Sequence, residues 1–137
     1  MSNVAAERAA LDASIDVIEA GYEYLLAYAA QGRQSDQGPG SGMGVRPHLG
    51  QMAEALAGLG EQARACAKAD PAIPEQAQAF FDAVDADAGV ALGAIRLVLA
   101  QTDISSQLID NLNASIHLRA VLTDLFLLDE TLKSAPD

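Results

Sequence analysis

Few side chains in this sequence have the chemistry of a metal centre. Asp12, Asp16, Glu19 and Glu23 recur at intervals of three or four residues, which places their carboxylates along one side of a helix. Bundles that hold two iron ions use Glu-x-x-His pairs, and zinc sites need several histidines or cysteines. Neither of the two histidines follows an acid by three residues. We therefore expect a hydrated row of carboxylates and predict no metal site and no cofactor.

Residues 31–47, QGRQSDQGPGSGMGVRP, contain five glycines and two prolines. The GPGSGMG stretch resembles a phosphate-binding loop only in its glycines, because it follows a predicted helix instead of a strand and lacks the Gly-Lys-Ser/Thr ending. No apolar period runs through the segment, which predicts a flexible loop. Cutting or shortening this loop is expected to cost little stability.

The single cysteine, Cys66, excludes an intrachain disulfide. No histidine lies near it in the sequence to act as a base. Its position on an apolar helical row predicts a buried structural thiol. The other members of the row are Leu49, Met52, Leu56, Leu59 and Ala63.

The window HLRAVLTDL (117–125) resembles the phosphoacceptor helix of histidine phosphotransfer domains and sensor-kinase dimerisation domains. The resemblance implies that His117 accepts the phosphoryl group and that Arg119 stabilises its charge. The window lacks the residue that usually separates His from Leu, which turns Arg119 about 200° away from His117 around the helix. The alternative is a boundary histidine that pairs with Asp110 or Asp124.

Composition and charge narrow the class of protein. Half of the 137 residues are apolar, mainly alanine and leucine, which favours helices over sheets in a single domain, residues 1–137. The net charge of −11 repels nucleic acid and anionic membranes, so we expect neither as a partner, whereas a protein with a basic surface is compatible. The N-terminal residues lack the apolar core of a signal peptide, and we expect a cytoplasmic location.

Apolar periodicity predicts four helices, over about residues 4–30, 47–69, 74–101 and 106–132, and thus an all-α four-helix bundle. The turn of about four residues before the last helix makes the third and fourth helices antiparallel neighbours. The loop at 31–47 is long enough to span the first helix, which leaves the connectivity of the first two helices open. On the third helix, Gly89 and Gly93 share a face with Ala86 and Ala100, where a neighbour can approach closely.

The last predicted helix is apolar on two sides. Its broad row, which includes Leu118, Leu125 and Leu128 with Phe126 at its flank, suits the core of the bundle. A narrower second row needs another cover, either a second copy of the chain or further helices around a central last helix. We expect a homodimer. Its predicted interface consists of Ile109, Ile116, Ala120, Leu127, Val17, Tyr24 and Tyr28.

These observations predict a non-enzymatic protein–protein interaction module, such as an adaptor, a chaperone, an inhibitor or immunity protein, or a subunit of an assembly. One alternative is a histidine phosphotransfer protein that uses His117. A second alternative is a helical bundle that binds a small molecule between its first and last helices.

Overall fold

The structure of the protein is a computed structural model, which describes residues 2–38, 44–71 and 73–134. The chain is all-helical, and no strand occurs within these ranges. The elements are α1 (Ser2–Ala29), α2 (Val45–Ala69), the 3-10 helix η1 (Glu75–Ala77), α3 (Gln78–Leu99), α4 (Ser106–Ala114) and α5 (His117–Ser134). None of the helices in the described ranges combines the length and apolar character needed to cross a bilayer.

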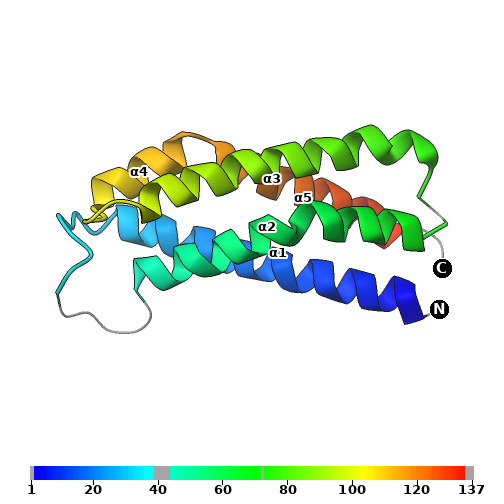
Figure 1. The fold of residues 1–137 in the computed structure, drawn as a ribbon, viewed down its shortest axis with the longest axis horizontal. Helices are drawn as coiled ribbons and strands as arrows, with labels where there is room; N and C mark the ends of the chain where they lie inside the picture. Colours follow the sequence, from blue (N-terminus) through cyan, green and yellow to red (C-terminus); the bar gives the residue numbers. More distant parts are fainter. Residues whose placement is uncertain (1, 39–43, 72, 135–137) are drawn as a thin grey trace.

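Along one long axis, α1, α2 and α3 run alternately in opposite directions, and α4 and α5 share the direction of α2 (Figure 1). The second helix, α2, turns back directly beside α1, which answers the question that the long loop left open. Helix α3 packs on α2, and α4 and α5 return antiparallel to α3. The contacts of the last two helices differ, because α4 packs mainly on α1 whereas α5 packs mainly on α3.

The apolar rows of the helices meet in a single hydrophobic core. Each row follows the helical period, so a long helix buries one continuous stripe. Close approach of α1 and α2 depends on Gly21, where an added Cβ would overlap the side chain of Met52. Cys66 lies in the core, as predicted. Fully buried members include Leu11, Ile18 and Leu25 of α1, Leu49 and Leu59 of α2, and Val84, Ala91 and Ile95 of α3.

The last predicted helix is interrupted, and the expectation of one continuous helix from about residue 106 to 132 is wrong. Helix α4 ends at Ala114, and Ile116 adopts a left-handed conformation with φ of 65°. The carbonyl of Ile116 then accepts a hydrogen bond from the N–H of Ala120, at 2.8 Å, and so begins α5. A periodic pattern does not report this break, because the left-handed residue is an isoleucine instead of the glycine usual at such positions.

Candidate functional site

A groove lies between α1 and α5, next to the break at Ile116. Because α4 packs on α1 while α5 turns toward α3, the two walls of the groove make few direct contacts. The groove has a volume of about 290 Å³. Its lining comprises Glu19, Tyr22 and Glu23 of α1 and Arg119, Leu122, Thr123 and Phe126 of α5.

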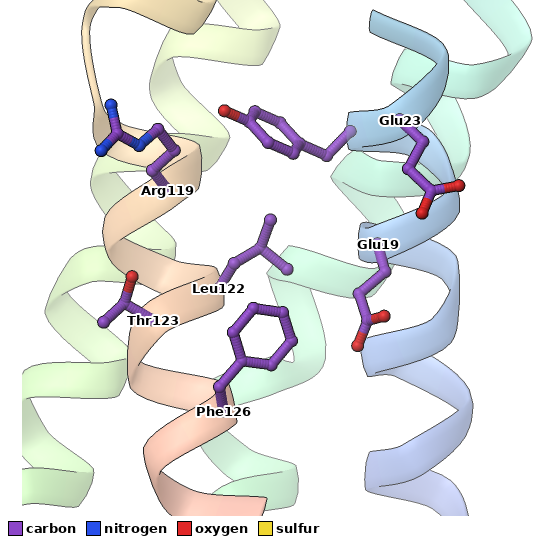
Figure 2. Close-up of a pocket in the computed structure, with 7 residues that line it drawn as sticks. Glu19, Glu23, Arg119, Leu122, Thr123 and Phe126 are labelled. Atoms are coloured by element: carbon purple, nitrogen blue, oxygen red, sulfur yellow. The ribbon is translucent and has the colours of Figure 1, made fainter. Parts of the chain in front are cut away.

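Apolar side chains form the floor of this groove and charged ones its walls. Figure 2 shows Leu122 and Phe126 pointing from α5 toward α1. Leu122 is buried, whereas the Phe126 side chain keeps 52% of its surface exposed. Glu19 and Glu23 lie one turn apart on the α1 wall (Figure 2). Carboxylates beside exposed aromatic surface favour a ligand that is both apolar and positively charged.

Arg119 lies at the end of the groove nearest the junction of α4 and α5 (Figure 2). It forms no ion pair within the part of the chain that the structure describes, although Glu19 and Glu23 line the same groove. Its guanidinium is therefore available to a carboxylate or a main-chain carbonyl of a ligand.

Two members of the predicted interface lie in the core of the monomer. Ile109 of α4 is completely buried, and Tyr28 of α1 is 1% exposed. The Tyr28 hydroxyl donates a hydrogen bond to the carbonyl of Ile104, at 2.5 Å, which satisfies its polar atom and allows burial. The expectation that these two side chains lie on the surface is therefore wrong.

Val17 and Tyr24, the other α1 residues of the predicted interface, face α2 and not α5. Val17 lines a shallow depression with Gly21 of α1 and His48 of α2. The Tyr24 ring stacks on the His48 ring with 3.8 Å between centroids. Helix α1 lies between α2 on one side and α4 and α5 on the other. The α1 and α5 residues of the predicted dimer interface therefore do not form one continuous surface.

The α5 side of the predicted interface is exposed. Ile116 at the junction and Leu127 on α5 each keep 56% of their surface, and Ala120 is partly buried. Leu127 directly follows Phe126, so apolar surface continues from the groove around α5. Phe126 is the residue that the sequence pattern misplaced, because its position beside the core row predicted a flank of the buried seam.

His117 is the first residue of α5 and is partly exposed. Arg119 lines the α1–α5 groove, away from the core side of the helix. Asp124, one of the two acids expected beside His117, instead contacts Asp87 of α3. His117 therefore lies at the start of α5, and Arg119, the cation that phosphotransfer would use, lies on a different face of the helix.

Neither a metal centre nor an activated thiol is formed by the residues that the structure describes. No three potential ligands among them approach closely enough to share a metal ion. Burial raises the pKa of the Cys66 thiol to about 11, which keeps it protonated and unreactive near neutral pH.

Comparisons with models of known protein families, with curated proteins and with solved structures find no match to this chain.

Proposed function

We propose that this protein is a non-enzymatic protein–protein interaction module that holds a segment of another protein in the α1–α5 groove. The main support for the proposal is the apolar floor of this groove, where Phe126 is half exposed next to the carboxylates of Glu19 and Glu23. A volume of about 290 Å³ accommodates a few side chains, and the groove is open along α5. These dimensions favour an extended or helical segment over an enclosed small molecule.

The charge of the chain supports a basic partner. At −11, the protein attracts positively charged segments, and the acidic row from Asp12 to Glu23 extends this attraction along α1. The partner segment would place apolar side chains on Phe126 and lysine or arginine beside Glu19 and Glu23. A carboxylate or carbonyl of the same segment would meet Arg119.

We further infer that α4 and α5 together take the fourth position of a four-helix bundle. Helix α4 covers one end of α1, and the change of direction at Ile116 carries α5 onto α3. A straight fourth helix would pack evenly on α1 and α3 and close the groove. The break is therefore the feature that creates the binding surface.

A synthetic amphipathic helical peptide of leucine and lysine, carrying a fluorescent label, tests the proposal by anisotropy. We expect Phe126→Asp to raise the dissociation constant at least about tenfold, because the apolar contact is lost. The double variant Glu19→Gln/Glu23→Gln should weaken binding and reduce its dependence on salt. Both substitutions are at the surface, so the helical circular dichroism spectrum should be retained.

The matched control is Glu54→Gln/Glu61→Gln, which removes the same charge from exposed positions on α2. This variant should bind the peptide more tightly than Glu19→Gln/Glu23→Gln does. Equal weakening by the two double variants would show a general attraction to an acidic protein and would contradict the groove. Binding unaffected by Phe126→Asp would contradict it as well.

A further inference from the structure

We propose that the outward face of α3 pairs antiparallel with the same face of a second copy of this chain. The proposal goes beyond the function above, since this face lies away from the α1–α5 groove. In Figure 1, α3 runs along one edge of the molecule. Its outward face bears two of the most exposed large apolar side chains described, Leu97 at 68% and Val90 at 51%.

The outward apolar row has the same spacing as the row that builds the core. Both rows advance by alternating steps of four and three residues, and they are displaced by two residues, which places them on opposite sides of α3. Such spacing keeps a row facing one partner helix over its whole length. The core row is Ala77, Phe81, Val84, Ala88, Ala91, Ile95 and Val98. The outward row, all exposed, is Ala79, Ala83, Ala86, Val90, Gly93, Leu97 and Ala100.

No part of the described monomer covers this row. A Cβ added at Gly93 or at the adjacent Gly89 would meet no atom within 4 Å. Gly89 and Gly93 would allow another helix to pack closely on α3, but no helix of the described monomer does so. Helix α2 covers one flank of α3, where Arg64 binds Asp82 and Asp85, and α5 covers the other, where Asp124 lies beside Asp87.

The row is self-complementary in shape when two copies run in opposite directions. Val90 is its central member, so an antiparallel pair places Val90 against Val90 of the second copy. Leu97, seven residues after the centre, then lies opposite Ala83, seven residues before it. The largest side chain of the row therefore meets a small one, which favours close packing of the two helices.

The charges at the edge of the row also favour a second copy in this direction. Asp82 and Asp85 share one guanidinium, that of Arg64, and keep a net negative charge. Arg96 lies on the same flank near the other end of α3 and has no ion-pair partner among the described residues. Antiparallel pairing places Arg96 of each copy between Asp82 and Asp85 of the other. Parallel pairing would instead place the two copies of Arg96 on opposite sides of the interface, away from Asp82 and Asp85 of the other copy.

Sedimentation and cysteine cross-linking of the full chain test the pairing. The wild type should change from a monomer to twice that mass as its concentration rises. Leu97→Asp should raise the dimer dissociation constant at least about tenfold, and Arg96→Asp about two- to fivefold. Leu127→Asp, which changes a similarly exposed leucine on α5, is the matched control and should leave the dimer unchanged.

Cross-linking reports the direction of the helices. Val90→Cys should form an intermolecular disulfide under mild oxidation, because the two copies of residue 90 meet at the twofold axis. Ala86→Cys should not, because antiparallel copies of residue 86 lie about 12 Å apart along the helix axis, beyond disulfide reach. Cys66 is buried and does not interfere.

Three results would overturn the proposal: a wild type that stays monomeric at every concentration, a dimer that tolerates Leu97→Asp, or cross-linking of both cysteine variants, which would show parallel pairing. The peptide-binding experiment separates the two proposals, dimerisation through α3 and peptide binding in the α1–α5 groove. Leu97→Asp should leave peptide binding intact, and Phe126→Asp should leave the dimer intact. Added salt should weaken the peptide complex and favour the dimer, since each copy carries −11.

Discussion

Ile116, between α4 and α5, is the one non-glycine residue in the described ranges with a positive φ. Its left-handed conformation costs an L-residue about 1–2 kcal/mol. A β-branched residue is especially unfavourable there. More than half of the side chain is exposed, so little burial offsets this cost within the monomer.

Ile116→Gly should therefore raise the free energy of unfolding by about 1 kcal/mol, since glycine adopts a positive φ without the clash of a Cβ. Urea unfolding followed by circular dichroism measures the change. Leu127→Gly is the control, because its exposed fraction is the same but it lies inside α5. That substitution should lower stability by about 1 kcal/mol. A destabilised Ile116→Gly variant would show that the isoleucine side chain contributes more than the strain costs.

At the scale of helices, α3 and α5 are joined through a pair of acids. Asp124 of α5 contacts Asp87 of α3, and its Oδ2 atom is buried without a hydrogen-bond donor from another residue. Burial, with the hydrogen bond and charge of Asp87, raises the pKa of Asp124 to about 7. We therefore expect the two carboxyl groups to share a proton, which would satisfy the buried oxygen and link the helices.

This pair should make the protein less stable as the pH rises. The native state keeps a proton on Asp124 that the unfolded chain releases near its ordinary pKa of about 4. The stabilisation is complete below that pH and is lost as the pH rises through about 7. Because the pair is partly exposed, we expect Asp124→Asn to exceed the wild type in stability above neutral pH by only about 1–2 kcal/mol.

Urea unfolding at a series of pH values measures this difference, which should shrink toward zero near pH 4 because the wild-type pair is then protonated. Glu54→Gln, at an exposed position on α2, should follow the wild type at every pH. Parallel pH profiles for Asp124→Asn and the wild type would refute the shared proton.

At the scale of the whole molecule, a cluster of partly buried polar contacts joins the segment after α1 to the starts of α2 and α4. The side chain of Asp36 is 8% exposed and accepts hydrogen bonds from Nε of Arg46, at 2.6 Å, and from the N–H of Ile104, at 2.7 Å. Arg46 also donates to the carbonyls of Leu99, Gln101 and Thr102. Arg33 and Ser106 exchange two further hydrogen bonds. Residues 33–36 are thus anchored, unlike the flexible loop predicted for 31–47, whose residues 39–43 lie outside the described ranges.

Asp36→Ala should lower the free energy of unfolding by about 2–4 kcal/mol, because it leaves Arg46 without its carboxylate and the Ile104 N–H without an acceptor. Burial raises the pKa of Asp36, but the bonds from Arg46 and Ile104 outweigh it and lower the pKa overall. The cluster should therefore hold at neutral pH and weaken only in acid.

Thermal or urea unfolding measures the loss, with Asp103→Ala as control. Asp103 accepts a hydrogen bond from Ser35 at the exposed surface, so its replacement should cost no more than about 0.5 kcal/mol. If the Asp36 variant were as stable as this control, the loop would be the unanchored linker that its glycines predict.

The one-dimensional pattern determined the first three long helices and the side of each that faces the core. The rows through Leu49 and Leu59, and the burial of Cys66, follow from the helical period, because a long amphipathic helix can hide only one stripe. The absence of β-type alternation likewise determined the all-α class. Helix formation and the position of the apolar stripe depend on residues three or four positions apart in one helix, and their spacing can be read from the sequence.

Only the tertiary structure decided the surfaces. Periodicity gives the direction of a side chain but not what lies opposite, so Tyr28 and Ile109 were predicted at an interface although contacts from other elements bury them. The left-handed Ile116 was likewise invisible, since nothing local demands it. Helix α5 packs mainly on α3 and leaves Phe126 exposed beside α1, because the path of a helix is set by the sum of its packing contacts.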